Sequence, residues 1–212
     1  MELLNFIIHI DEYLVILLQN YGNLIYPILF FIIFSETGLV VTPFLPGDSL
    51  LFALGALAFE GQLNIIALGI MLIIAAFLGN TTNYLIGKHF GHFILHSENK
   101  ILRKIIKEEY IKDTHDFFEK HGGKAVIFSR FFPILRTFAP FVAGIGEMTA
   151  YKYSSYNIIG GTLWVTLVLT LGYLFGTIPF VKNNFSYIMI GIVLISLLPV
   201  VLTIIKTKLK KA

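Results

Sequence analysis

The sequence contains no cysteine, which excludes a disulfide framework, thiol catalysis and thiolate metal sites. Charged residues are scarce, at 14% of the chain, against about a quarter in soluble domains. No lysine or arginine precedes Lys88, so the N-terminus lacks the basic region of a cleavable secretory signal and we expect no removed segment. The lack of a long basic run argues against nucleic acid as a partner.

Apolar residues, in contrast, are in surplus. They make up 56% of the 212 residues, and the mean hydropathy is +0.79. One soluble core of this size cannot bury so many apolar side chains, so lipid must solvate much of the surface. The composition predicts an all-α integral membrane protein and disfavours a soluble enzyme, a disordered chain and a fibrous repeat.

Several apolar stretches are long enough to cross a bilayer, which takes about 20 residues. Residues 63–86 and 154–178 are predicted spans, and residues 187–205 are a third. Residues 3–18 contain three polar side chains, so this stretch either crosses or lies in the interface. Residues 88–124 carry many charges of both signs and are expected to form an amphipathic helix on the membrane surface.

Two further apolar stretches, residues 24–59 and 125–148, are interrupted by charges and prolines. Proline breaks helices, and in lipid the freed backbone groups need partners from protein or a wet cavity. We therefore predict that both stretches are broken, re-entrant helical hairpins. The predicted interruptions are Glu36–Gly38 and Pro43–Asp48 in the first stretch, and Arg130, Pro133, Arg136 and Pro140 in the second.

The distribution of lysine supports re-entry. Segment 88–124 and the tail at 206–212 are both rich in basic residues, so the positive-inside rule places both in the cytoplasm. Spans 154–178 and 187–205 already supply two crossings between them, so stretch 125–148 must enter and leave by one face. The loop before residue 63 carries Glu60 and no basic residue, so stretch 24–59 is expected to enter from the outside.

The two broken stretches also resemble each other. Phe34-Ser35-Glu36 aligns with Phe128-Ser129-Arg130, and the same offset pairs Phe44 with Phe138 and Pro46 with Pro140. Inverted repeats that contain broken helices are a transporter architecture. We predict a single domain over residues 1–212. It comprises one repeat at about 24–87, the cytoplasmic segment 88–124, a second repeat at about 125–205 and the basic tail 206–212.

Four ionisable residues lie within the broken stretches: Glu36, Asp48, Arg130 and Arg136. Each charge left in lipid would cost about 2.5–3.5 kcal/mol, so these groups must face a cavity or each other. They form either a buried ion-pair lock or a binding site. Arginine binds phosphate with two parallel hydrogen bonds and stays charged when buried. A turn at Pro133 would let both arginines address one anion, and the carboxylates would suit proton exchange.

A polar cluster late in the first span, Asn80, Asn83 and Tyr84, either bonds neighbouring helices or lines a headgroup path. Ser129 and Thr137, beside the two arginines, are further candidate contacts. His89, His92 and His96 could share one helix face, but no other segment offers a further ligand. We therefore predict no metal and no cofactor.

These motifs carry a resemblance to a known family. They are Phe34-Ser35-Glu36, Phe44-Leu45-Pro46-Gly47-Asp48, Gly79, Tyr84, Gly87-Lys88, Gly91, Phe128-Ser129-Arg130-Phe131-Phe132-Pro133, Arg136-Thr137, Pro140 and Ala143-Gly144. Together, from about residue 24 to 178, the chain resembles the DedA family (the SNARE-associated or VTT-domain superfamily). The resemblance implies inverted repeats with re-entrant helices and movement of lipids between leaflets. It places the family's functional acids and arginines at Glu36, Asp48, Arg130 and Arg136. Asn80 stands where the family often has aspartate, which argues against a proton relay there.

The predicted function is therefore transport of a phosphate-bearing lipid headgroup in the bacterial cytoplasmic membrane. By resemblance, undecaprenyl phosphate is the first candidate. Proton coupling and a homo-oligomer are left open. The alternatives are a phosphatidylethanolamine flippase, a phospholipid scramblase, or a proton-driven transporter of small solutes or cations. An enzyme acting on lipid phosphate is disfavoured because neither broken stretch contains histidine or an acid-rich metal motif. A purely structural membrane protein would leave the four charges unexplained.

Overall fold

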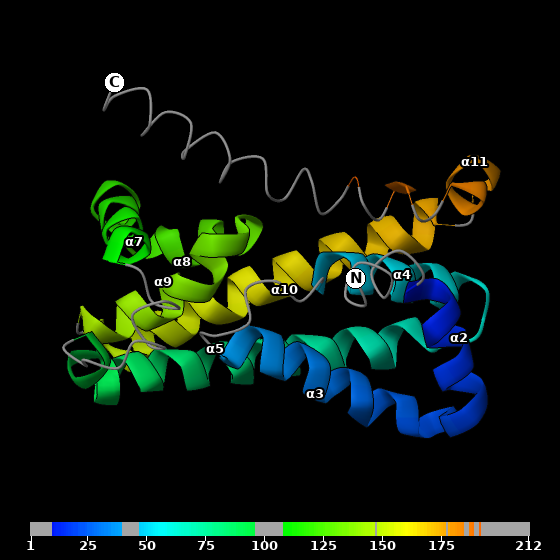
Figure 1. Ribbon diagram of the computed structural model, residues 1–212, viewed down its shortest axis with the longest axis horizontal. Helices are drawn as coiled ribbons and strands as arrows, with labels where there is room; N and C mark the ends of the chain where they lie inside the picture. Colours follow the sequence, from blue (N-terminus) through cyan, green and yellow to red (C-terminus); the bar gives the residue numbers. More distant parts are fainter. Residues whose placement is uncertain are drawn as a thin grey trace. The chain divides into compact units, whose positions relative to one another are not determined.

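The computed structural model describes residues 10–39, 47–95, 108–146, 148–176, 178–184, 187–188 and 191. In these ranges the chain is helical and contains no β-strand (Figure 1). The helices are α2 (Ile10–Tyr21), α3 (Ile25–Gly38), α4 (Gly47–Phe59), α5 (Ile65–Leu95), α7 (Glu108–His121), α8 (Ala125–Phe128), α9 (Pro133–Ile145), α10 (Ala150–Phe175) and α11 (Pro179–Asn183), with short 3-10 turns η1 (Gly22–Leu24), η2 (Gly122–Lys124) and η3 (Ser129–Phe131).

Three helical stretches are long and apolar enough to cross a membrane: Leu14–Gly38, Ile65–Gly91 and Ala150–Phe175. The second and third coincide with the predicted spans 63–86 and 154–178, whose helical character is confirmed. The first begins within predicted stretch 3–18 and ends inside predicted stretch 24–59. The third predicted span, 187–205, lies outside the described residues except for residues 187, 188 and 191. Many apolar side chains along the two long helices are exposed, as contact with lipid requires: Ile66, Ile70, Ile74, Leu163, Leu167 and Leu171.

The predicted break in stretch 125–148 is real, but it is shorter than expected. The chain leaves α8 through η3, becomes extended at Phe132 (φ −123°, ψ 115°), and enters α9 at Pro133. A residue before proline avoids the helical region, and proline itself fits the first helical position. Arg136 and Pro140 were expected to interrupt the helix as well, and this expectation is wrong, because both lie inside α9. Proline is tolerated within a membrane helix where neighbouring groups satisfy the freed carbonyl.

In stretch 24–59, the helix ends later than the sequence suggests. Glu36, Thr37 and Gly38 were predicted to interrupt it, yet all three belong to the last turn of α3. The Thr37 hydroxyl donates to the Ile33 carbonyl at 2.8 Å, which allows a polar side chain to stay helical in an apolar setting. The second helix, α4, starts at Gly47, so the interruption predicted at 43–48 falls largely outside the described residues.

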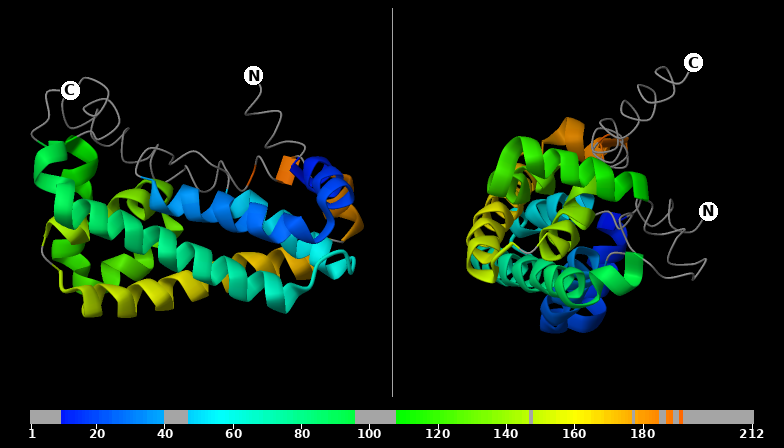
Figure 2. Two further views of the ribbon diagram at one scale, coloured as in Figure 1. Left: turned by 90° about the horizontal axis from the view of Figure 1, so that it is seen from below. Right: turned by 90° about the vertical axis from the view of Figure 1, so that its left-hand side faces the viewer.

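Segment 88–124 was predicted to form an amphipathic helix on the membrane surface. Its first residues continue α5 as far as Leu95 (Figure 2), α7 runs from Glu108 to His121, and residues 96–107 lie outside the described part of the chain. α7 is amphipathic, as predicted, but it packs on protein. Thr114 is fully buried, and Phe118 contacts a cluster that includes Tyr84 and Tyr153.

The described chain forms two compact units. Unit 1 draws on the ranges Met1–Leu29, Pro46–Met71 and Val165–Ala212, and unit 2 on Phe30–Leu45 and Leu72–Trp164. The long helices α3, α5 and α10 each contribute residues to both units.

In unit 1, α4 crosses the end of α10 with backbone against backbone. A Cβ atom added at Gly55 would overlap the Leu169 carbonyl, and one added at Gly172 would overlap the Phe52 carbonyl. Gly176 lies in the same way against Ala56. Small residues let membrane helices approach closely enough for dispersion and Cα–H···O contacts to hold them together.

Unit 2 contains a crossing of the same kind, between α9 and the end of α5. Gly144 faces the Tyr84 carbonyl, Gly87 faces the Phe141 carbonyl, and Gly91 faces Ile145. At an offset of 89 residues, Phe141, Gly144 and Ile145 correspond to the unit 1 residues Phe52, Gly55 and Ala56. This register differs from the offset of 94 residues that aligns Phe34 with Phe128 in the sequence. Each short apolar helix therefore meets a long helix through the same small-residue pattern.

We predict that Gly144→Ala and Gly55→Ala each lower the thermal unfolding temperature of the purified protein in detergent. The added methyl group must push two backbones apart, which costs about 1–3 kcal/mol. Gly69→Ala is the matched control, because a Cβ there would meet only a Leu169 side-chain atom, at 3.6 Å. Equal unfolding temperatures for the three variants would contradict the close crossings.

Candidate functional site

Unit 2 contains a buried polar cluster. Of the described buried polar or charged side chains, all except Ser49 belong to this unit: Glu36, Thr37, Asn80, Asn83, Thr114, Ser129, Arg130, Arg136, Thr137 and Asn157. Apart from Thr114, they come from the end of α3, the middle of α5, η3, α9 and the first half of α10. Five separate segments thus bring polar groups together within helices that are otherwise apolar.

The guanidinium of Arg130 lies at the centre of this cluster. Arg130 is only 2% exposed. Its Nη2 donates to the Asn157 backbone carbonyl at 3.3 Å and to the Asn157 side-chain oxygen. The Asn80 amide fits its neighbours when its oxygen accepts from Arg130 Nη1, at 3.0 Å, and its nitrogen donates to the Thr37 carbonyl, at 3.1 Å. Among the described residues, Arg130 forms no ion pair.

Two glycines of α10 make room for this side chain. A Cβ atom at Gly161 would lie 3.3–3.4 Å from three atoms of the Arg130 guanidinium, and one at Gly160 would lie 3.4 Å from Nε. The bare face of α10 therefore packs directly against the charged group.

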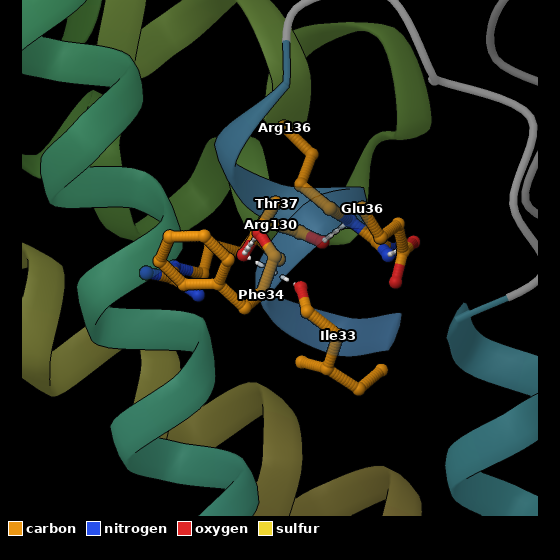
Figure 3. A network of polar contacts seen from close by, with 6 residues as sticks. All are labelled: Ile33, Phe34, Glu36, Thr37, Arg130 and Arg136. Carbon is orange, nitrogen blue, oxygen red and sulfur yellow. Dashed lines mark hydrogen bonds and ion pairs between the residues drawn. The ribbon is translucent and has the colours of Figure 1, made fainter. Parts of the chain in front are cut away.

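Arg136 has different partners. Its Nη1 pairs with Glu36 Oε1 at 3.4 Å, and both side chains are buried. Its Nε donates to the Arg130 backbone carbonyl at 2.9 Å, and its guanidinium lies 4.6 Å from the ring centre of Trp164. Figure 3 shows the two arginine side chains pointing to opposite sides, with Glu36 beside Arg136.

The local backbone explains this arrangement. On an unbroken helix, side chains six positions apart would point about 240° apart around the axis. Here η3 and the extended Phe132 bend the chain, so that Arg136 in the first turn of α9 reaches back to the Arg130 carbonyl. The two arginines thus join one cluster through different partners, and their binding of a common anion stays a prediction.

Of the secondary candidates, Asn80 and Asn83 form hydrogen bonds within the cluster, whereas Tyr84 packs on another side chain. Asn80 contacts Arg130 directly, and Asn83 donates to the Thr137 carbonyl at 2.9 Å, which links α5 to α9. Tyr84 stacks on Tyr153 with ring centres 4.3 Å apart and donates to the Met148 carbonyl, which is a packing role. Ser129 donates to the Val126 carbonyl at 3.0 Å, within its own turn.

Asp48 belongs to unit 1. It lies in the first turn of α4, where a carboxylate is stabilised by the partial positive charge of the helix N-terminus. The helix starts at Gly47, so Asp48 is its second residue.

Two residues of the cluster were missed at the level of sequence. Asn157 holds Arg130, and Trp164 covers Arg136. Asn157 carried a usable signal, because an amide inside an apolar span is costly unless it has a hydrogen-bond partner. Trp164 carried none, since an aromatic side chain in a span is ordinarily packing.

Among the described buried side chains of the cluster, the charges do not cancel. Glu36 supplies one negative charge against two guanidinium groups, and the other described polar members are neutral. An excess positive charge in a low-dielectric interior attracts an anion more strongly than the same charge in water. The described residues contain no group of three acidic, histidine or cysteine side chains that could hold a metal ion.

Fold and cluster together define a helical integral membrane protein with a buried cationic polar centre. A model of the VTT domain family matches residues 45–174. Protein DedA of Escherichia coli (strain K12) is 50% identical over 208 residues, which cover 97% of this chain and 94% of that protein. The chain belongs to the DedA family of VTT-domain membrane proteins.

Two more distant relatives agree with this assignment. A Mycobacterium leprae protein, named only as a membrane protein, is 43% identical over 168 residues, covering 79% of this chain and 74% of its own. Inner membrane protein YqjA of Escherichia coli (strain K12) is 33% identical over 182 residues, covering 86% and 80%. No solved structure matches the chain.

We predict that Gly161→Leu disrupts the cluster, because its side chain would occupy the position of the Arg130 guanidinium. The unfolding temperature in detergent should fall clearly, since displacing a buried charge from its partners costs about 3 kcal/mol or more. The neighbouring Thr162→Leu is the control, because Thr162 is exposed and faces lipid or solvent. If both variants unfolded like the wild type, the packing of Arg130 on α10 would be refuted.

Proposed function

We propose that this protein is a transporter that moves a phosphate-bearing lipid headgroup between the leaflets of the bacterial cytoplasmic membrane. The observation that carries the proposal is the buried cluster of two arginines with a single carboxylate. Such a centre binds an anion in the hydrocarbon layer while the lipid chains remain in the surrounding bilayer. Undecaprenyl phosphate, a phosphate monoester, is the preferred substrate.

The chemistry of the headgroup fits the cluster. A phosphate monoester carries a charge of about −1.5 to −2 at neutral pH and three acceptor oxygens. Guanidinium groups match these oxygens in geometry and stay charged when desolvated. One such headgroup would balance the two positive charges of Arg130 and Arg136 once Glu36 is protonated, without any further counter-ion.

Glu36 provides a means of release. In the described state its carboxylate occupies Arg136 at 3.4 Å, so it competes with the headgroup for the same guanidinium. Protonation of Glu36 would weaken this ion pair and favour headgroup binding, whereas deprotonation would expel the headgroup. Transport would then be coupled to a proton gradient, with Asp48 as a second proton-exchanging group in unit 1.

The paired helix crossings support a two-repeat transport architecture. Because α4 and α9 meet long helices through corresponding residues, we propose that they belong to inverted repeats. In this proposal both broken stretches are re-entrant, and segment 88–124 and the C-terminal tail face the cytoplasm.

The same cluster allows other phosphate lipids as substrates. A phosphatidylethanolamine flippase or a scramblase would also need an acceptor for the headgroup amine, and Glu36 and Asp48 are the acids available. A proton-driven transporter of cations is disfavoured because the cluster has excess positive charge.

We predict that Arg136→Gln slows the translocation of undecaprenyl phosphate in proteoliposomes by about tenfold or more, since a charge-assisted hydrogen bond contributes about 1.5–3 kcal/mol.

Glu36→Gln should abolish the dependence of the translocation rate on a pH gradient, because the side chain no longer exchanges a proton.

The control variant is Lys120→Gln, which removes an exposed positive charge on α7 and should transport at the wild-type rate. Wild-type rates in Arg136→Gln and Arg130→Gln would overturn the proposed function. Transport of phosphatidylethanolamine in place of undecaprenyl phosphate would keep the arginine site but reject the preferred substrate.

A further inference from the structure

The Arg130 guanidinium is bound by neutral oxygen atoms in place of a carboxylate. A buried arginine is ordinarily paired with a carboxylate, because an unpaired charge in an apolar interior is costly. Here the acceptors on Nη1 and Nη2 are the amide oxygens of Asn80 and Asn157 and a backbone carbonyl. These groups solvate the guanidinium and leave its full charge in place.

We propose that Asn157 and Asn80 determine the charge selectivity of the site. They are positioning residues that hold Arg130 through neutral oxygens and so keep its charge for an anionic headgroup. The inference rests on the proposed function and extends it to α10, from which the sequence offered no candidate.

Both amides are oriented by contacts on their far side. The Asn157 nitrogen donates to the Phe77 carbonyl and to the Thr81 hydroxyl, each at 3.1 Å. The Asn80 nitrogen donates to the Thr37 carbonyl at 3.1 Å. Since an amide has one donor end and one acceptor end, these bonds turn both oxygens toward Arg130, one from α5 and one from α10.

The contrast with Arg136 shows what the amides achieve. Arg136 is paired with Glu36, so its charge becomes available only when that pair opens. The charge of Arg130 has no such internal competitor among the described residues. A single carboxylate at position 80 or 157 would cancel the excess charge and make the cluster neutral. A neutral cluster should no longer distinguish a phosphate monoester from a zwitterionic phosphodiester.

We expect Asn157→Asp to remove this selectivity. The experiment measures the dissociation constants of dodecyl phosphate and of dodecylphosphocholine with the full chain, purified in an uncharged maltoside detergent. The wild type should prefer dodecyl phosphate, and Asn157→Asp should reduce the ratio of the two affinities by about tenfold, the effect of one added charge at close range. Asn80→Asp tests the same charge change from α5.

The matched control is Asn157→Ala. It loses the same contacts to Phe77 and Thr81 but adds no charge, so its unfolding temperature should fall while the affinity ratio stays near the wild-type value. A purely structural role for Asn157 would give Asp and Ala variants with the same ratio, and that result would overturn the inference.

The variants Arg130→Gln and Arg136→Gln distinguish a failure of the arginine binding site from a failure of the charge selectivity assigned to Asn157 and Asn80. If dodecyl phosphate binds Arg130→Gln and Arg136→Gln as it binds the wild type, the proposed function fails. If binding needs the arginines but both aspartate variants keep the wild-type preference, only the inference on Asn157 and Asn80 fails.

Discussion

The constraint on which this structure depends is the free-energy cost of burying a guanidinium charge inside a bundle of apolar membrane helices. Arg130 is 2% exposed, so the protein itself must replace the water that would otherwise surround it. Amide oxygens, a backbone carbonyl and the glycine face of α10 together perform this task. The bend at η3 and the bare glycine face of α10 place the backbone so that these groups surround the guanidinium.

The parts of the fold set by local chemistry could be predicted from the sequence. Hydropathy located the spans that became α5 and most of α10, and Pro133 located the break before α9, because a residue before proline avoids helix. The same reasoning predicted a break at Pro140, which lies inside α9. Its effect depends on whether neighbouring groups satisfy the carbonyl it frees, and that is decided by packing. The continuation of α5 to Leu95 was missed because Lys88 and the histidines looked like the start of a surface segment.

The candidate site was predictable in its charges and unpredictable in its contacts. The cost of buried charge singled out Glu36, Asp48, Arg130 and Arg136. The structure brings Glu36 and the two arginines into one cluster, whereas Asp48 belongs to unit 1. Which partner each arginine takes depends on the rotation of α5 and α10 about their axes. For α5, that rotation depends on contacts between residues far apart in the sequence, such as those of Gly79 with the end of α3. No pattern within the span could identify Asn157 as the acceptor for Arg130.

Trp164 provides a built-in fluorescent reporter of the arginine cluster. It is the chain's single tryptophan, fully buried, and its indole ring lies against the guanidinium of Arg136. All tryptophan fluorescence of the protein therefore originates beside Arg136. Occupancy of that centre can be followed optically in the unlabelled protein, because any movement of the Arg136 charge alters the field across the indole.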